Sequence, residues 1–196
     1  MNPGKIALTI LIVLLASCAP TRPQFTEVSV PPVREQHQGF SLMPLDESGW
    51  LMLANRPEGI VLGKQTGTDE NHIIRAFTQV IPPFKSQDEF IGYAKTALSM
   101  EDPTRHKLLS HSDKAIKFKG QPCVRTYDMM EDHKAVKRSD RPDYMILEAS
   151  SLVCEHPQKG VAVIVAYSYR YYPGHDDKGL ATKAQKIFDS IEFTAF

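Results

Sequence analysis

Cys18 has the clearest potential chemistry in this 196-residue chain, because its thiol stands at the end of an export-like segment. Lys5 gives that segment a positive start, and an apolar run over residues 6–16 follows. The run has 11 residues, whereas a membrane-spanning helix needs about 20. Two small residues directly before the cysteine provide a cleavage point. The pattern predicts a signal peptide over residues 1–17 that is removed.

The sequence Leu15-Ala16-Ser17-Cys18 resembles the lipobox of bacterial lipoproteins. The resemblance implies that the Cys18 thiol receives a diacylglyceryl group, that the signal peptide is cut, and that the new amino terminus is acylated, for example with palmitate. Each buried methylene contributes about 0.8 kcal/mol, so several acyl chains hold a protein firmly on a membrane. The alternative is an ordinary signal peptide, cut nearby, in which Cys18 is incidental.

The residue after the cysteine bears on which membrane would carry the anchor. Ala19 stands where the lipoprotein family places an aspartate for retention at the inner membrane. The resemblance therefore implies a lipid anchor in the bacterial cell envelope. If the source has two membranes, it favours the outer membrane, facing the periplasm.

The charge balance excludes nucleic acid as a partner. The chain has 23 Lys and Arg and 23 Asp and Glu. Loss of Lys5 with the signal peptide leaves 22 against 23, a side-chain charge of −1. Affinity for nucleic acid comes mainly from a basic surface that neutralises phosphates. A nearly neutral chain does not supply that field.

Cys123 and Cys154 are predicted to form a disulfide. Both lie in stretches with strand character, separated by a charged, proline-containing segment over residues 132–143. The midpoint of 123 and 154 is 138.5, so an antiparallel hairpin folded about that segment places the two cysteines opposite each other. Disulfides persist in exported proteins. The alternative is a pair of buried free thiols.

We expect no metal, cofactor or catalytic residue. Among the seven histidines none has a recognised ligand spacing, and His106 and His111, five residues apart, would lie on opposite faces of an extended strand. Ser110-His111-Ser112-Asp113 has the residue types of a catalytic triad. Triad members converge from separated positions, however, so neighbouring residues cannot form one. A polar turn is the better interpretation.

Tyr169, Arg170, Tyr171 and Tyr172 form a candidate binding surface at the end of the strongest predicted strand, residues 161–172. Tyr and Arg are the side chains that most often anchor interfaces or stack on sugars. The partner would be an envelope protein or a glycan. The alternative is that the tyrosines pack on a helix and expose only their hydroxyls.

The remaining elements must position these residues. Apolar runs broken by turn residues predict strands over 40–45, 50–54, 59–62, 72–81, 107–110 and 115–118. A capping box, Ser86-Gln87-Asp88-Glu89, begins a helix, and an apolar stripe from Leu180 to Ile191 predicts a second. This order indicates an α+β fold, an antiparallel β-sheet covered by two main helices.

The chain divides into three parts: the signal peptide over 1–17, a lipidated proline-rich tether over 18–38, and one globular domain over 39–196. The opening Gly39-Phe40-Ser41-Leu42, with Pro44 and Trp50, and the closing segment 184–193 resemble the PsbP-like α/β/α sandwich group. The resemblance implies an accessory or binding role, and it supplies no catalytic residues to carry over.

The sequence therefore predicts a membrane-anchored envelope lipoprotein with a non-enzymatic accessory or ligand- and partner-binding role. One alternative is a small periplasmic hydrolase with an unrecognised site, which would have a deep pocket with converging titratable groups. Another is a purely structural envelope lipoprotein.

Overall fold

The computed structural model describes residues 25–97, 102–137, 143–158 and 160–196. Cys18 and the predicted signal peptide lie outside the described residues. The elements in chain order are β1 (Thr26–Glu27), β2 (Glu35–His37), β3 (Phe40–Leu42), β4 (Leu51–Arg56), β5 (Gly59–Gln65), β6 (Asn71–Val80), α1 (Gln87–Ala97), β7 (His106–Phe118), β8 (Gln121–Asp132), β9 (Met145–Glu155), β10 (Val161–Tyr171), α2 (Leu180–Ser190) and β11 (Glu192–Phe193). Among the described residues, no helix has the length and apolar composition needed to cross a bilayer.

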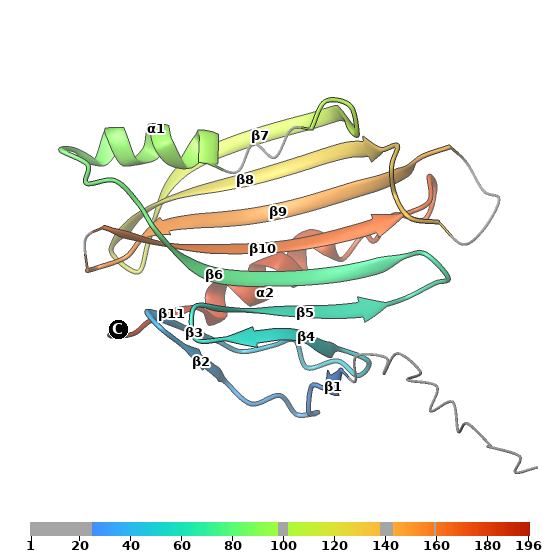
Figure 1. The fold of residues 1–196 in the computed structure, drawn as a ribbon, viewed down its shortest axis with the longest axis horizontal. Coiled ribbons are helices and arrows are strands. Elements are labelled where there is room, and N and C mark those ends of the chain that lie inside the picture. Colours follow the sequence, from blue (N-terminus) through green and yellow to red (C-terminus); the bar gives the residue numbers. More distant parts are fainter. Residues whose placement is uncertain (1–24, 98–101, 138–142, 159) are drawn as a thin grey trace, which may run out of the picture.

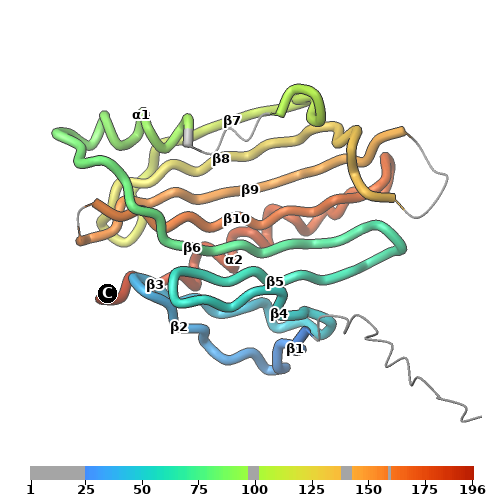
Figure 2. Tube along the Cα trace, in the orientation of Figure 1, coloured from blue at the N-terminus to red at the C-terminus, as the bar shows by residue number. Residues whose placement is uncertain are grey.

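An eight-stranded antiparallel sheet, in the order β1-β4-β5-β6-β10-β9-β8-β7, forms the body of the protein. Figure 1 shows α1 in front of this sheet and α2 behind it. A small sheet, β11-β3-β2, lies at the lower edge. Figure 2 follows the chain from the blue N-terminal strands at that edge to the red C-terminal helix. The predicted α+β class, an antiparallel sheet with two helices, is confirmed.

The larger core lies between the sheet and α2. Alternate residues of β10, among them Val163, Val165 and Tyr167, point toward the helix and are at most 1% exposed. The helix meets them with one buried stripe, Leu180, Ala184, Ile187 and Phe188, whose spacing follows the helical repeat. Burial of this stripe explains why a helix forms here.

The opposite face of the sheet carries α1 over β8 and β9. Phe90 and Ala94 are fully buried in a second cluster with apolar residues of these strands. The predicted cap is present: the Glu89 amide donates to Ser86 Oγ at 3.2 Å, and the Glu89 carboxylate accepts the Lys85 amide at 2.8 Å. The carboxylate thus reaches one residue further back than in the usual capping box.

The hairpin of β8 and β9 has the predicted register. Cys123 lies opposite Cys154, and a disulfide joins them across a Cα–Cα distance of 4.1 Å. The neighbouring strand differs from expectation, because the two predicted pieces are one continuous strand, β7, with an irregularity between Leu108 and Ser110. β7 is the edge of the sheet and is mostly exposed. The polar residues from Ser110 to Asp113, which suggested a turn, are therefore part of an exposed edge strand.

The segment expected to be an extended tether contains two strands of the folded domain. Thr26 of β1 pairs with Met52, and Glu35 of β2 pairs with Leu42. Between these strands the Val28 amide donates to the Trp50 carbonyl at 2.9 Å. The domain therefore begins near Thr26 and not near Gly39. Pro31 and Pro32 lie between β1 and β2, where they displace no donor from a long ladder.

Replacing both Cys123 and Cys154 with alanine should lower the free energy of unfolding by roughly 3–4 kcal/mol, because the disulfide closes a loop of 31 residues. Urea denaturation of the oxidised wild type and the double variant measures the difference. Reduced wild type is the matched control, since it keeps both side chains. An unchanged midpoint, or free alkylation of both thiols in native protein, would contradict the pairing.

Candidate functional site

The predicted tyrosine surface is buried. Tyr169, Tyr171 and Tyr172 have exposed fractions of 6%, 3% and 5%. Alternation along β10 turns the first two toward the face that α2 covers, and the Tyr172 hydroxyl donates to buried Asp69 at 2.5 Å. Their rings cannot present a face to a partner or a sugar. The prediction of a binding surface at Tyr169–Tyr172 is therefore wrong. The tyrosines pack inside the domain, as the alternative expected, but the Tyr172 hydroxyl is buried instead of exposed.

Instead, the β10 tyrosines enclose His72 of β6. The Tyr169 ring stacks on the imidazole with centroids 4.0 Å apart, and the Tyr167 hydroxyl lies 3.0 Å from His72 Nδ1. Trp50 closes the cluster at 6.4 Å from the histidine ring. These contacts arise because Tyr169 and His72 are directly opposite in the antiparallel ladder. His72 is only 4% exposed.

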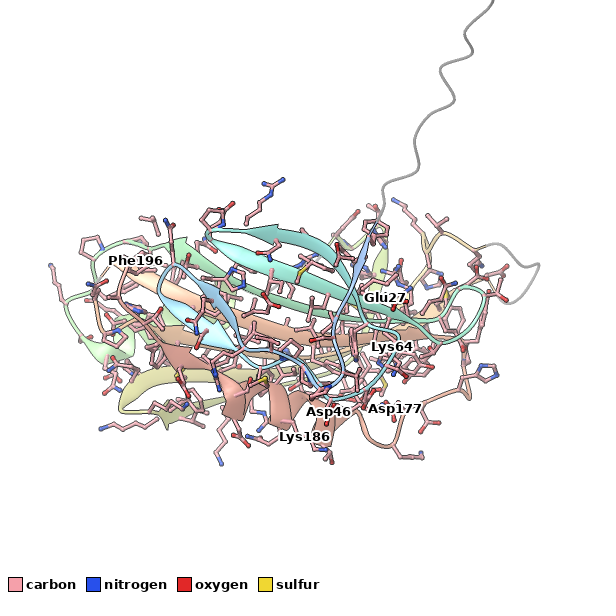
Figure 3. All side chains as sticks on the ribbon, turned by 90° about the horizontal axis from the view of Figure 1, so that it is seen from below. Glu27, Asp46, Lys64, Asp177, Lys186 and Phe196 are labelled. Carbon is pink, nitrogen blue, oxygen red and sulfur yellow. A yellow bond between two sulfur atoms is a disulfide. The ribbon has the colours of Figure 1, made fainter. Side chains whose placement is uncertain are left out.

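Two ion pairs lie around the His72 cluster. Lys64 Nζ contacts Glu47 at 2.9 Å, and Lys183 Nζ of α2 contacts Asp177 at 2.8 Å. Figure 3 labels one member of each pair, Lys64 and Asp177, on the lower side of the molecule. Burial is the main cause that lowers the pKa of His72 to about 4, and the positive charge of Lys183 lowers it further. The imidazole is therefore neutral near pH 7.

A neutral histidine beside a tyrosine hydroxyl has the groups for proton transfer, but both side chains of this pair are buried. Tyr167 is 0% exposed, and burial raises its pKa far above the usual range. A groove of about 320 Å³ on β4–β6 and a hollow of about 240 Å³ beside His156 are both lined by other residues. The cluster joins α2 and the loop before it to the sheet, and we assign it a structural role.

Arg170, the fourth residue of the predicted binding surface, belongs to a partly buried ionic cluster around Asp132. Asp132 is 0% exposed, and Arg105 binds both of its oxygens at 2.8 Å. Arg170 Nη2 contacts the same carboxylate at 3.1 Å. Burial alone would raise the pKa of Asp132, but the hydrogen bonds from Arg105 and the charge of Arg170 hold it below its usual value. No pattern in the sequence predicts this cluster, because Arg105, Asp132 and Arg170 lie far apart in the chain.

The two histidines of β7 lie on one face of the strand, contrary to expectation. His106 pairs with Asp132 in the ladder and His111 with Asp128, four residues away on the same face. The irregularity between Leu108 and Ser110 shifts the alternation by one residue. His111 Nδ1 lies 2.6 Å from Asp128, which raises the pKa of the histidine. In the part of the chain that the structure describes, no group of three or more metal-binding side chains could hold an ion.

Comparisons with known proteins add a fold likeness only. No family model matches this chain, and no curated protein is similar enough to be matched. The solution structure of cyanobacterial PsbP (CyanoP) from Synechocystis sp. PCC 6803 is similar at 14% identity and a TM-score of 0.44, over 92% of this chain and 99% of that one. A crystal structure from Bacteroides thetaiotaomicron VPI-5482 is similar at 11% identity and a TM-score of 0.38, over 79% of this chain and 45% of that one. At these levels of similarity we draw nothing about family or function from either structure.

The buried neutral His72 should make the fold sensitive to acid. Its folded pKa of about 4 lies below the unfolded value of 6.5, so the unfolded chain takes up a proton first as the pH falls. The free energy of unfolding should therefore decrease by about 3 kcal/mol between pH 6.5 and 4 on account of this residue. His72→Gln, which cannot titrate, should show a flatter decrease over that interval in urea denaturation. Equal slopes for the two proteins would contradict the assignment.

Proposed function

We propose that this protein is a lipoprotein of the bacterial cell envelope, anchored through Cys18, with a non-enzymatic accessory or partner-binding role. The observation that carries the proposal is the Leu15-Ala16-Ser17-Cys18 pattern at the end of a short apolar run. The folded domain supports it, because Thr26 begins β1 only eight residues after Cys18. Eight extended residues reach at most about 29 Å, so a lipid on Cys18 would hold the domain close to its membrane.

The disulfide supports an oxidising compartment. Cys123 and Cys154 are 0% and 2% exposed and bonded to each other near one end of the β8–β9 hairpin. Such bonds persist in exported proteins and are rare in the cytoplasm. The pairing agrees with removal of a signal peptide on the way out of the cell.

The arrangement of titratable groups supports a non-enzymatic role. His72 and Tyr167, whose pKa values both depart strongly from their usual values, are covered by side chains and do not line either of the two hollows described above. A hydrolase requires a general acid or base that can contact its substrate. The remaining roles for a compact domain held near a membrane are recognition of an envelope protein or glycan and contact with the membrane itself.

Replacing Cys18 with serine should abolish incorporation of a palmitate analogue and leave an uncleaved or soluble precursor, because serine supplies no thiol for the lipid. Metabolic labelling followed by gel analysis of membrane and soluble fractions measures both effects. The Cys123→Ala, Cys154→Ala double variant is the control and should still be labelled. Persistence of the label in Cys18→Ser would refute the anchor.

Crosslinking in intact cells tests the accessory role. We expect the anchored wild type to recover the same partner repeatedly, and a Cys18→Ser protein that is exported without lipid to recover much less of it. A turnover assay with purified lipidated protein on general ester, phosphate and glycoside substrates runs in parallel. Hydrolysis by that protein, abolished by a single substitution, would overturn the non-enzymatic proposal.

A further inference from the structure

Half of the front face of the sheet is not covered by any described element. Figure 1 shows α1 over the β7–β9 side of this face, whereas β4, β5 and β6 have no helix in front of them. The polar side chains of Arg56, Gln65, Asn71 and Gln79 lie on this face toward the ends of the strands. Between them, apart from Arg75, the side chains are apolar and partly exposed: Leu51, Leu53, Ala54, Val61, Ile73 and Phe77. We call this set, together with Arg75, the β4–β6 face.

The composition of the β4–β6 face is unusual for a solvated sheet. On the opposite side of the same strands Ile60, Leu62 and Ile74 are at most 1% exposed beneath the α2 core. An antiparallel sheet that is wet on one side normally alternates buried apolar residues with polar ones. Here the outward residues in the middle of the strands are apolar too, with Arg75 as the exception. Leu53, at a bulge, lies so close over Gly63 that a Cβ on the glycine would meet Leu53 Cδ1 at 2.6 Å.

A groove lined by both apolar and charged residues lies on the β4–β6 face. Its volume is about 320 Å³, and its lining includes Val61 and Phe77 as well as Arg56, Glu58 and Arg75. Arg75 is exposed in the middle of β6 and makes no hydrogen bond or ion pair with any residue that the structure describes. The nearest contact between Arg56 and Glu58 is 4.0 Å. The groove thus combines apolar lining residues with a cation, Arg75, that pairs with no side chain in the described part of the chain.

The position of the predicted anchor indicates what covers the β4–β6 face. β1 pairs with β4, so the chain enters the domain at the edge beside this face. Phe25, directly before β1, is 44% exposed. Cys18 precedes Thr26 by eight residues, a reach of at most about 29 Å. A lipid at Cys18 therefore keeps a bilayer within reach of this face, whereas β7 is at the far edge of the sheet.

We propose that the β4–β6 face docks on the bilayer that carries the Cys18 lipid, with its apolar side chains in the interface and Arg75 among the lipid phosphates. The inference rests on the proposed function, because it requires the anchor. Apolar side chains with basic neighbours are typical of proteins that lie on a membrane surface. A cation near an anionic membrane surface increases the affinity of the protein for that membrane, and added salt reduces this contribution.

A fluorescent reporter on an introduced cysteine tests the docking. All three native cysteines are blocked in the mature protein under the proposal, one by lipid and two by the disulfide, so an added thiol reacts alone. The full lipidated protein carries an environment-sensitive dye at Val61→Cys and is reconstituted in phosphatidylcholine vesicles containing phosphatidylglycerol. The matched control carries the dye at Ser112→Cys, on exposed β7.

We expect nitroxide-labelled lipids to quench the dye at position 61 and not at position 112. Vesicle flotation of the same samples reports whether the lipid anchor holds the protein on the membrane. It therefore separates a failure of the anchor from a failure of the docking. Protein that floats while neither dye is quenched overturns the docking and leaves the anchor intact. Equal quenching at both positions also overturns an oriented contact. Protein that does not float, and whose Cys18 is unmodified, overturns the anchor and the docking together.

Arg75 provides a second, independent readout. Arg75→Gln should reduce the docked fraction about fivefold in vesicles with phosphatidylglycerol, since one cation near an anionic surface is lost. Arg75→Lys keeps the charge and should retain the docking. Both variants should float like wild type, because the acyl chains hold them. Equal quenching of wild type and Arg75→Gln would contradict the role of this cation.

Discussion

The alternation of side chains across β6 and β10, the two central strands, is the constraint on which the rest of the structure depends. One set of residues points to the α2 side and includes Tyr167, Tyr169 and His72, which can be buried only if α2 and the preceding loop pack over them. The other set points to the α1 side, where the helix covers β8 and β9. Because α1 is short, this second set is only partly covered, and the β4–β6 face remains open.

Burial of polar groups on the α2 side follows from the same constraint. A histidine placed opposite Tyr169 in the ladder must be neutral, since neither the sheet nor the helix offers it a carboxylate in direct contact. The charges that surround it, Glu47 with Lys64 and Asp177 with Lys183, satisfy each other. The cluster thus fixes α2 on the sheet, and its unusual pKa values result from packing without implying catalysis.

Local signals in the sequence predicted much of the fold. The cap at Ser86 and Glu89 depends on residues three apart, and the register of Cys123 with Cys154 follows from the symmetry of one hairpin. Contacts between distant segments were not predictable. The pairing of Thr26 with Met52 and the capture of Arg170 by Asp132 depend on how whole strands are ordered in the sheet, and no spacing in the sequence encodes that order. The tyrosines of β10 are an example. The sequence predicted the strand that carries Tyr169 and Tyr171, but it did not predict that α2 would cover the side of the strand on which they lie.

The proposed anchor and the open β4–β6 face belong to one physical picture, in which a short chain holds an apolar sheet face near lipid. Its central claim is covalent, and intact mass analysis of protein extracted from its native membrane tests it most directly. We predict a mature chain that begins at Cys18 and carries the added mass of a diacylglyceryl group and an amide-linked acyl chain. A mature chain with an unmodified amino terminus at another residue would contradict the claim.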